Sequence, residues 1–166
     1  MAHPLSVLGI VHTVLSVPPV VAGIYSFARY RGIAPATSAG QVYLLGLTLS
    51  VLTSFGLSSV IGFNPGHALG VLALLAAFGG VLVPRLAFFG RLRAYLSALG
   101  LSFSFFLLLV PGINETLTRL PASHPLADGP RSPFVQAALL CWLGIFVMGA
   151  VLQVRSIRSQ TRIAVR

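Results

Sequence analysis

Five long runs of apolar residues constrain this chain more than any other feature. They cover approximately residues 4–28, 40–61, 66–84, 92–112 and 133–154, and Gly, Pro and Arg separate each run from the next. An α-helix rises about 1.5 Å per residue, so about twenty apolar residues cross the hydrocarbon layer of a bilayer. The sequence therefore predicts an all-α integral membrane protein with five transmembrane helices.

Composition supports this class. The chain is 56% hydrophobic and 8% charged, with a mean hydropathy of +0.94, whereas soluble domains carry about 25% charged residues. Its single cysteine, Cys141, excludes an intrachain disulfide, and its place in the fifth run predicts a small buried side chain. The first basic residues follow the first run, which is the reverse of a secretory signal, so we expect the first helix to stay in the mature protein.

The arginines predict which ends of the helices face the cytoplasm. If the runs cross the membrane alternately, nine of the eleven basic residues fall on one side, and Lys and Arg are retained on the cytoplasmic side. We therefore expect a multi-pass protein of the cytoplasmic (inner) membrane, with its N-terminus outside and its C-terminus in the cytoplasm. This distribution explains the net charge of +9 without a nucleic-acid partner. The nine residues are Arg29, Arg31, Arg85, Arg91, Arg93, Arg155, Arg158, Arg162 and Arg166.

The tyrosines agree with this orientation. All four fall near the predicted cytoplasmic ends of helices, where amphipathic rings favour the level of the lipid headgroups. They are Tyr25, Tyr30, Tyr43 and Tyr95.

The same pattern predicts three parts of the chain. Residues 1–112 would form a four-helix transmembrane core, and residues 113–132 a Pro-rich, ordered or semi-ordered outer loop with both acidic residues, Glu115 and Asp128. Residues 133–166 would form the fifth transmembrane helix and a basic cytoplasmic tail. Arginines recur at spacings of three and four in the tail, so we expect the fifth helix to continue into it.

Two histidines are the candidate site residues. His12 lies about two turns into the first helix, before Pro18 and Pro19, and His67 follows the Asn-Pro-Gly turn at 64–66. The adjacent prolines predict a kink and leave backbone carbonyls without their usual partners. An ionisable side chain inside a membrane indicates a functional role. The alternatives are a neutral imidazole bonded to a neighbouring helix, or a ligand of haem b or a hydrogen-bond donor to quinone.

No catalytic residue is predicted. His3 and His124 fall on the same outer side, but their spacing matches no metal motif, so the identity of any metal is unknown. Ser123, His124 and Asp128 are close in sequence without a nucleophile elbow, and a catalytic triad is defined by geometry instead.

The chain resembles a family of uncharacterised bacterial predicted membrane proteins, a domain of unknown function with four core helices. The resemblance spans approximately residues 8–112, and it implies that the fifth helix and its loop are an addition to the core. It implies no established activity. Its motifs are His12 with Gly23, GQVY at 40–43, TSFGL at 53–57, GFNPGHAL at 62–69 and PG at 111–112.

These observations favour a non-enzymatic integral subunit of a larger membrane complex, for example a respiratory or other redox assembly. The reason is the shortage of intramembrane charge together with the lack of a catalytic motif. One alternative is a small electron-transfer protein that binds haem b or quinone through His12 and His67. Another is a small transporter or lipid-binding protein. The expected partners are the lipid bilayer and either another membrane protein or further copies of this chain.

Overall fold

The computed structural model of the chain describes residues 7–57, 62, 64–121 and 123–163, apart from the side chains of 161–163. Five of its helices are long and apolar enough to cross a membrane. This result confirms an all-helical chain with five such segments. The helices are α1 (Val7–Tyr30), α2 (Ser38–Leu57), α3 (Pro65–Leu82), α4 (Arg93–Arg119) and α5 (Pro133–Ile163), with short 3-10 helices η1 (Val83–Arg85) and η2 (Ala87–Leu92) between α3 and α4.

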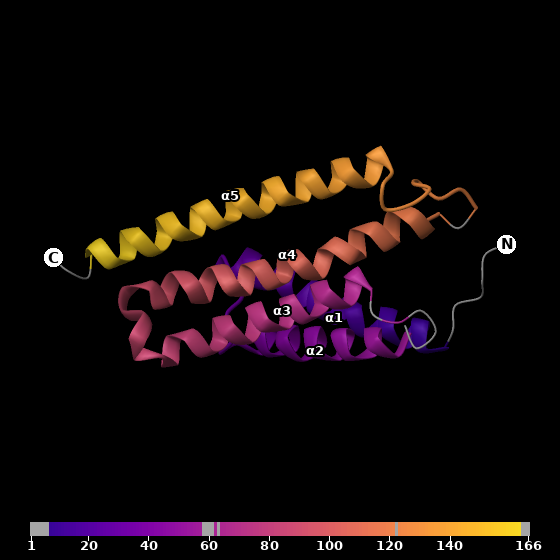
Figure 1. The fold of residues 1–166 in the computed structure, drawn as a ribbon. Helices are drawn as coiled ribbons and strands as arrows, with labels where there is room; N and C mark the ends of the chain where they lie inside the picture. The colour runs from indigo at the N-terminus through magenta and orange to yellow at the C-terminus, as the bar shows by residue number, and fades with distance from the viewer. Residues whose placement is uncertain (1–6, 58–61, 63, 122, 164–166) are drawn as a thin grey trace.

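The helices form an elongated bundle in which neighbours in sequence lie antiparallel (Figure 1). α1 packs chiefly on α2 and α3 chiefly on α4, while α5 lies along α4 at the edge of the bundle. α1 begins at the end of the bundle that carries the α4–α5 connection, and α5 finishes at the opposite end (Figure 1). The start of α1 and the end of α5 therefore lie at opposite ends of the bundle.

The α1–α2 contact explains the two adjacent prolines. α1 continues as a helix across Pro18 and Pro19, of which Pro18 is exposed and Pro19 is buried. A Cβ atom at Gly46 on α2 would lie 2.6 Å from Cδ of Pro19, so the glycine makes room for the proline ring. Packing against a neighbouring helix thus accommodates a residue that costs α1 a backbone hydrogen bond. The kink stays a prediction.

Small residues also bring α3 and α4 together. A Cβ atom at Gly80 would lie 2.9 Å from Cγ of Leu101 and 3.0 Å from the carbonyl oxygen of Ser97. A Cβ atom at Gly100 would lie 3.0 Å from the carbonyl oxygen of Ala76. Such residues allow two backbones to approach closely, which is how helices commonly pack inside membranes.

The core corrects one expectation about the tyrosines. Tyr43 is fully buried instead of lying at the headgroup level, and its hydroxyl lies 2.7 Å from Oγ of Ser104. Because the Ser104 hydroxyl donates to the carbonyl of Leu101, Tyr43 donates to Ser104. Around this bond lie buried apolar side chains from α1 to α4, namely Ala22, Leu47, Val51, Ala73, Ala77, Leu101, Phe105 and Leu107.

α4 is longer than predicted. It continues through Pro111 and Gly112 to Arg119, so residues 113–119 are helical and not part of a loop. A proline inside a helix removes one backbone donor, and the turns beyond it can still form. Here an ion pair between Glu115 and Arg119, one turn apart, supports those turns. The connection to α5 therefore consists of residues 120–132.

This connection folds back on α4. The backbone N–H of Ala127 donates to the carbonyl of Leu117, and that of Leu126 donates to the carbonyl of Leu120. α5 then runs to Ile163, which confirms that the helix continues into the basic tail. Cys141 on α5 is exposed, contrary to the expected burial, because α5 is covered on one side only.

Candidate functional site

His12 joins α1 to α2 near the end of the bundle where α1 begins. Its Nδ1 lies 3.0 Å from Oγ1 of Thr53 on α2. One turn further along α1, Oγ of Ser16 lies 2.6 Å from Oγ of Ser50 and 2.7 Å from the carbonyl oxygen of His12, to which it donates. The two helices are thus connected by two successive polar contacts. His12 takes part in the contact that lies nearer the start of α1.

The hydrogen bonds of Thr53 indicate the tautomer of His12. A threonine hydroxyl has one proton, and that of Thr53 is directed at carbonyls of its own helix, those of Leu49 at 2.8 Å and Ser50 at 3.0 Å. Oγ1 of Thr53 therefore accepts a hydrogen bond from Nδ1–H of His12. In this tautomer Nε2 of His12 carries a lone pair, which is able to accept a hydrogen bond or to ligate a metal.

His67 begins α3 and forms a reciprocal cap with Asn64. The backbone N–H of His67 donates to the side-chain oxygen of Asn64 at 3.2 Å, while the backbone N–H of Asn64 donates to Nδ1 of His67 at 3.1 Å. Since Nδ1 accepts, the ring proton is on Nε2, which donates to the carbonyl of Ser54 at 3.1 Å. The imidazole is 3% exposed and stacks on Phe55, with 4.6 Å between ring centroids.

The structure brings the two candidate histidines to the same part of α2. His12 bonds Thr53 and His67 bonds Ser54, which are consecutive residues near the end of that helix. The two rings differ in chemistry. Both nitrogens of His67 already take part in hydrogen bonds, so this arrangement leaves it no lone pair for iron. His12 retains an acceptor nitrogen.

Among the described residues, no further histidine joins this site. His3 lies outside the described residues. His124 is exposed in the α4–α5 connection, where its backbone N–H donates to the carbonyl of Pro121. In the described part of the chain, no group of three or more His, Cys, Asp or Glu side chains is placed to hold a metal ion.

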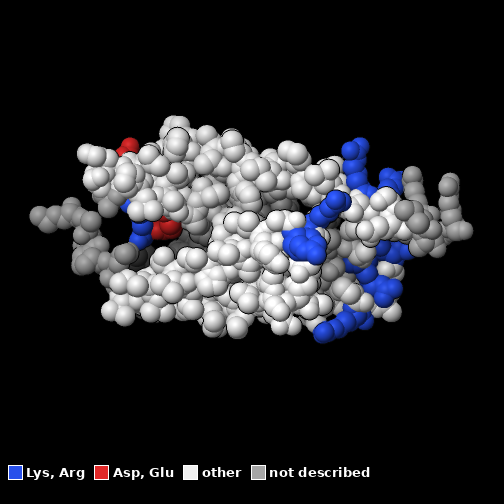
Figure 2. Space-filling model, turned by 180° about the vertical axis from the view of Figure 1, so that it is seen from behind, with Lys and Arg blue, Asp and Glu red and all other residues white. Residues whose placement is uncertain are grey.

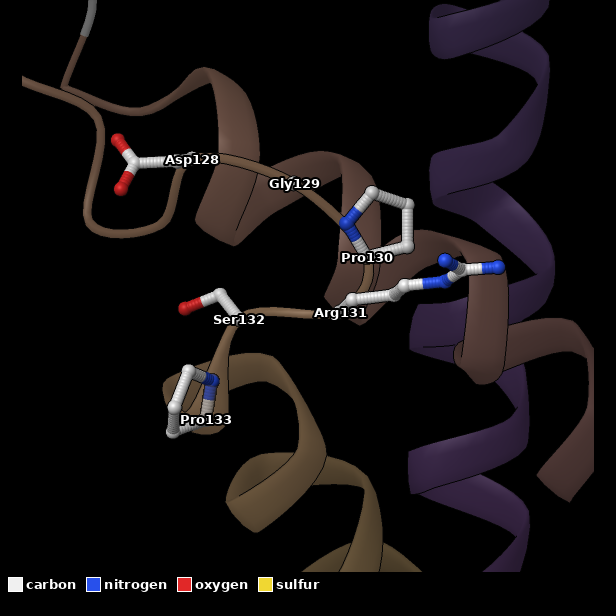
Figure 3. Close-up of a pocket in the computed structure, with 6 residues that line it drawn as sticks. All are labelled: Asp128, Gly129, Pro130, Arg131, Ser132 and Pro133. Atoms are coloured by element: carbon white, nitrogen blue, oxygen red, sulfur yellow. The ribbon is translucent and has the colours of Figure 1, made fainter.

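A pocket of about 460 Å³ lies in the α4–α5 connection (Figure 3). It is lined by six consecutive residues, Asp128 to Pro133, and the N–H of Ser132 donates to the carbonyl of Gly129 across the turn. The side chains of Asp128 and Arg131 point away from one another (Figure 3). This pocket is the concave side of a turn, and its charged groups do not converge on a common point.

Charge is divided between the two ends of the bundle. Most of the basic surface gathers toward one end, and the acidic side chains lie at the other (Figure 2). The acidic end holds Glu115, which pairs with Arg119. The candidate histidine site and the arginine-rich surface are therefore at opposite ends.

Sequence reasoning missed the groups on α2 that bond the two histidines, which are the hydroxyl of Thr53 for His12 and the backbone carbonyl of Ser54 for His67. Ser50, Thr53 and Ser54 recur on α2 at a spacing of three and four, which places them within one turn of each other. This spacing was the available signal for the contacts that the hydroxyls of Ser50 and Thr53 make with α1, whereas a backbone carbonyl leaves no signal in the sequence. Two further buried polar atoms, Oγ of Ser26 and Oδ1 of Asn114, have no hydrogen-bond partner among the described residues.

Comparison with known proteins found no matching family model, no matching curated protein and no matching solved structure. The resemblance to a family of unknown function over residues 8–112 therefore stays a prediction.

Proposed function

We propose that the chain is a multi-pass protein of the bacterial cytoplasmic membrane, and that it serves as a non-enzymatic subunit of a larger membrane complex, such as a redox assembly. The N-terminus is outside and the C-terminus is in the cytoplasm. Five apolar helices of sufficient length support insertion. The concentration of arginine at the end where α5 finishes supports the orientation.

The exposure of α5 carries the proposal of a partner. This helix has 31 residues and packs on one side only. On its uncovered surface, Ala137, Cys141 and Gly144 follow one another at spacings of four and three, and a Cβ atom at Gly144 would meet nothing within 4 Å. Large exposed side chains such as Leu140 and Met148 lie beside them. A row of small residues between large ones gives a neighbouring transmembrane helix a place to approach closely.

Co-purification tests the proposal. The tagged full-length protein, extracted from its native membrane with a mild detergent after cross-linking, should carry a second protein in stoichiometric amount. Gly144→Trp should release that partner, because the indole fills the row of small residues. Leu45→Trp is the matched control, since Leu45 is an exposed apolar residue on α2.

Two results would contradict the proposal. If the wild-type protein purifies alone, or only with further copies of itself, the proposal of a complex with a different protein is wrong. If Gly144→Trp and Leu45→Trp lose the partner to the same extent, the interface does not lie specifically on α5.

The geometry of His12 supports a second candidate function, the binding of haem b or a quinol. Its Nε2 is an acceptor, which suits ligation of iron or a hydrogen bond from a quinol hydroxyl. His67 does not support this role, because Nδ1 of His67 accepts from Asn64 and its Nε2–H donates to Ser54.

Absorbance distinguishes this candidate. A gently purified haem protein would show a Soret band and an α band that change on reduction with dithionite, and His12→Ala would abolish both. A quinone protein would be colourless in that range, and His12→Ala would lower the amount of quinone extracted from it. A preparation that contains neither cofactor would exclude this second function.

A further inference from the structure

A second cavity, an open depression of about 450 Å³ in the surface, lies at the arginine-rich end of the bundle. Its walls come from four segments of the chain and are mainly apolar. They are the α1–α2 connection with Ile33 and Pro35, η1 with Pro84, the first turns of α4 with Ala94 and Ala98, and α5 with Ile157. The cavity thus lies where the bundle is joined to the last turns of α5.

Arg93 is the one charged residue that lines this cavity within the described part of the chain. Its guanidinium is held by two backbone carbonyls: Nε donates to Gly90 at 3.0 Å and Nη1 donates to Pro84 at 3.4 Å. A guanidinium has five N–H groups, so these bonds fix the group and leave it further donors. Arg93 is therefore positioned beside an apolar cavity before any ligand binds.

The chain has no acidic residue to neutralise Arg93. It contains only two, Glu115 and Asp128, and Glu115 pairs with Arg119 toward the far end of α4, while Asp128 lies in the α4–α5 connection. Both are at the opposite end of the bundle from the arginine-rich surface (Figure 2). An anion that meets Arg93 at this cavity would therefore not compete with an acidic side chain of this chain.

Neighbouring residues indicate the level of the lipid headgroups. Phe88 is 93% exposed and contacts Phe89 edge to face, with 5.5 Å between ring centroids. These rings lie in the connection that also carries Arg85 and Arg91. Aromatic rings next to basic side chains are typical of segments at a membrane–water interface, where apolar groups enter the lipid and cations meet phosphate.

We propose that this cavity binds an anionic phospholipid of the cytoplasmic leaflet, with Arg93 at the headgroup phosphate and the upper acyl chains along the apolar walls. Pockets of this kind between transmembrane helices suit acidic lipids because they combine a fixed cation with an apolar surface. The proposal requires the membrane orientation given above, but it does not require the partner subunit.

Native mass spectrometry of the purified full-length protein in a neutral detergent tests this site. The wild type should bind one dioleoyl phosphatidylglycerol in preference to dioleoyl phosphatidylcholine, which has the same acyl chains. Arg93→Gln should weaken that binding about fivefold, the effect of one interfacial cation. Arg158→Gln is the matched control, because Arg158 is an exposed arginine of α5 that does not line the cavity; it should change binding by less than about twofold.

A second variant tests the apolar walls of the cavity separately from its cation. Ala94→Phe fills the cavity and leaves Arg93 and its two carbonyl partners in place, so it should also weaken binding of phosphatidylglycerol. Unchanged binding in Ala94→Phe would overturn the proposal, as would equal losses in Arg93→Gln and Arg158→Gln, or equal affinity for the two lipids. A final measurement compares the binding of sn-glycerol 3-phosphate with that of the phospholipid. If it binds as tightly as the phospholipid, the site recognises a free phosphate ester and the lipid assignment is wrong.

Discussion

His67 illustrates how a titratable side chain inside an apolar bundle can serve structure. Its ring completes the N-terminal cap of α3 through Asn64 and ties the start of this helix to Ser54 near the end of α2. One imidazole therefore satisfies a backbone donor and a backbone acceptor that have few other partners where two helices end. This role requires the neutral tautomer with its proton on Nε2.

Replacement of His67 tests this role. We expect His67→Ala to lower the free energy of unfolding by about 1–3 kcal/mol, the sum of a lost cap and an unsatisfied buried group. Thermal unfolding in detergent measures the change. His124→Ala is the control, because His124 is an exposed residue of the α4–α5 connection. Equal stability of the two variants would contradict the capping role.

The close packing of α3 on α4 depends on glycine at the positions where the two helices touch. Gly79 and Gly80 are neighbours on α3, but only Gly80 faces α4 closely: a Cβ atom there would meet Leu101 and the backbone of Ser97, whereas one at Gly79 would meet nothing within 4 Å. The same substitution at adjacent positions therefore separates packing from the intrinsic helix preference of alanine.

We expect Gly80→Ala to lower the free energy of unfolding by about 1–3 kcal/mol, because the new methyl group forces α3 and α4 apart. Gly79→Ala should raise it by up to about 1 kcal/mol, since alanine favours the helix and finds open space. Unfolding of the two variants under identical detergent conditions gives the comparison. Destabilisation by both substitutions to the same extent would show that the helix contact is not as close as described.

Over the whole molecule, the separation of arginine from the acidic residues predicts a fixed orientation. In a Cys141→Ala background, Ser123→Cys marks the α4–α5 connection and Ser159→Cys marks the end of α5. A membrane-impermeant maleimide should label Ser123→Cys in intact cells, and Ser159→Cys only after the membrane is permeabilised. The reverse pattern would show that the arginines face outward, and it would contradict the orientation on which the lipid site depends.

The parts of the fold that were predicted correctly are those that depend on residues close together in the sequence. Apolar runs bounded by Gly, Pro and Arg were sufficient to place five helices, and the turn at 64–66 was sufficient to place His67 in the first turn of α3. The end of α4 was predicted too early, because Pro111 resembles a helix terminus even though the polar turns after it remain helical.

Features that depend on distant residues could not be predicted. The burial of Tyr43 depends on Ser104, and the environment of His12 depends on Thr53, 41 residues away. Nothing near either residue in sequence indicates its partner. Because its partner was unknown, Tyr43 was predicted to lie at the membrane–water interface. For the same reason, His12 was predicted to bind a cofactor.

The pairing of α1 with α2 and of α3 with α4 has a consequence for biosynthesis. Each pair consists of helices adjacent in sequence, so its interface can form as soon as the second helix of the pair has left the ribosome. α5 rests chiefly on α4 and can join after both hairpins have met. We therefore expect truncation before α5 to leave a four-helix unit that inserts and folds, so that the order of synthesis is also the order of assembly.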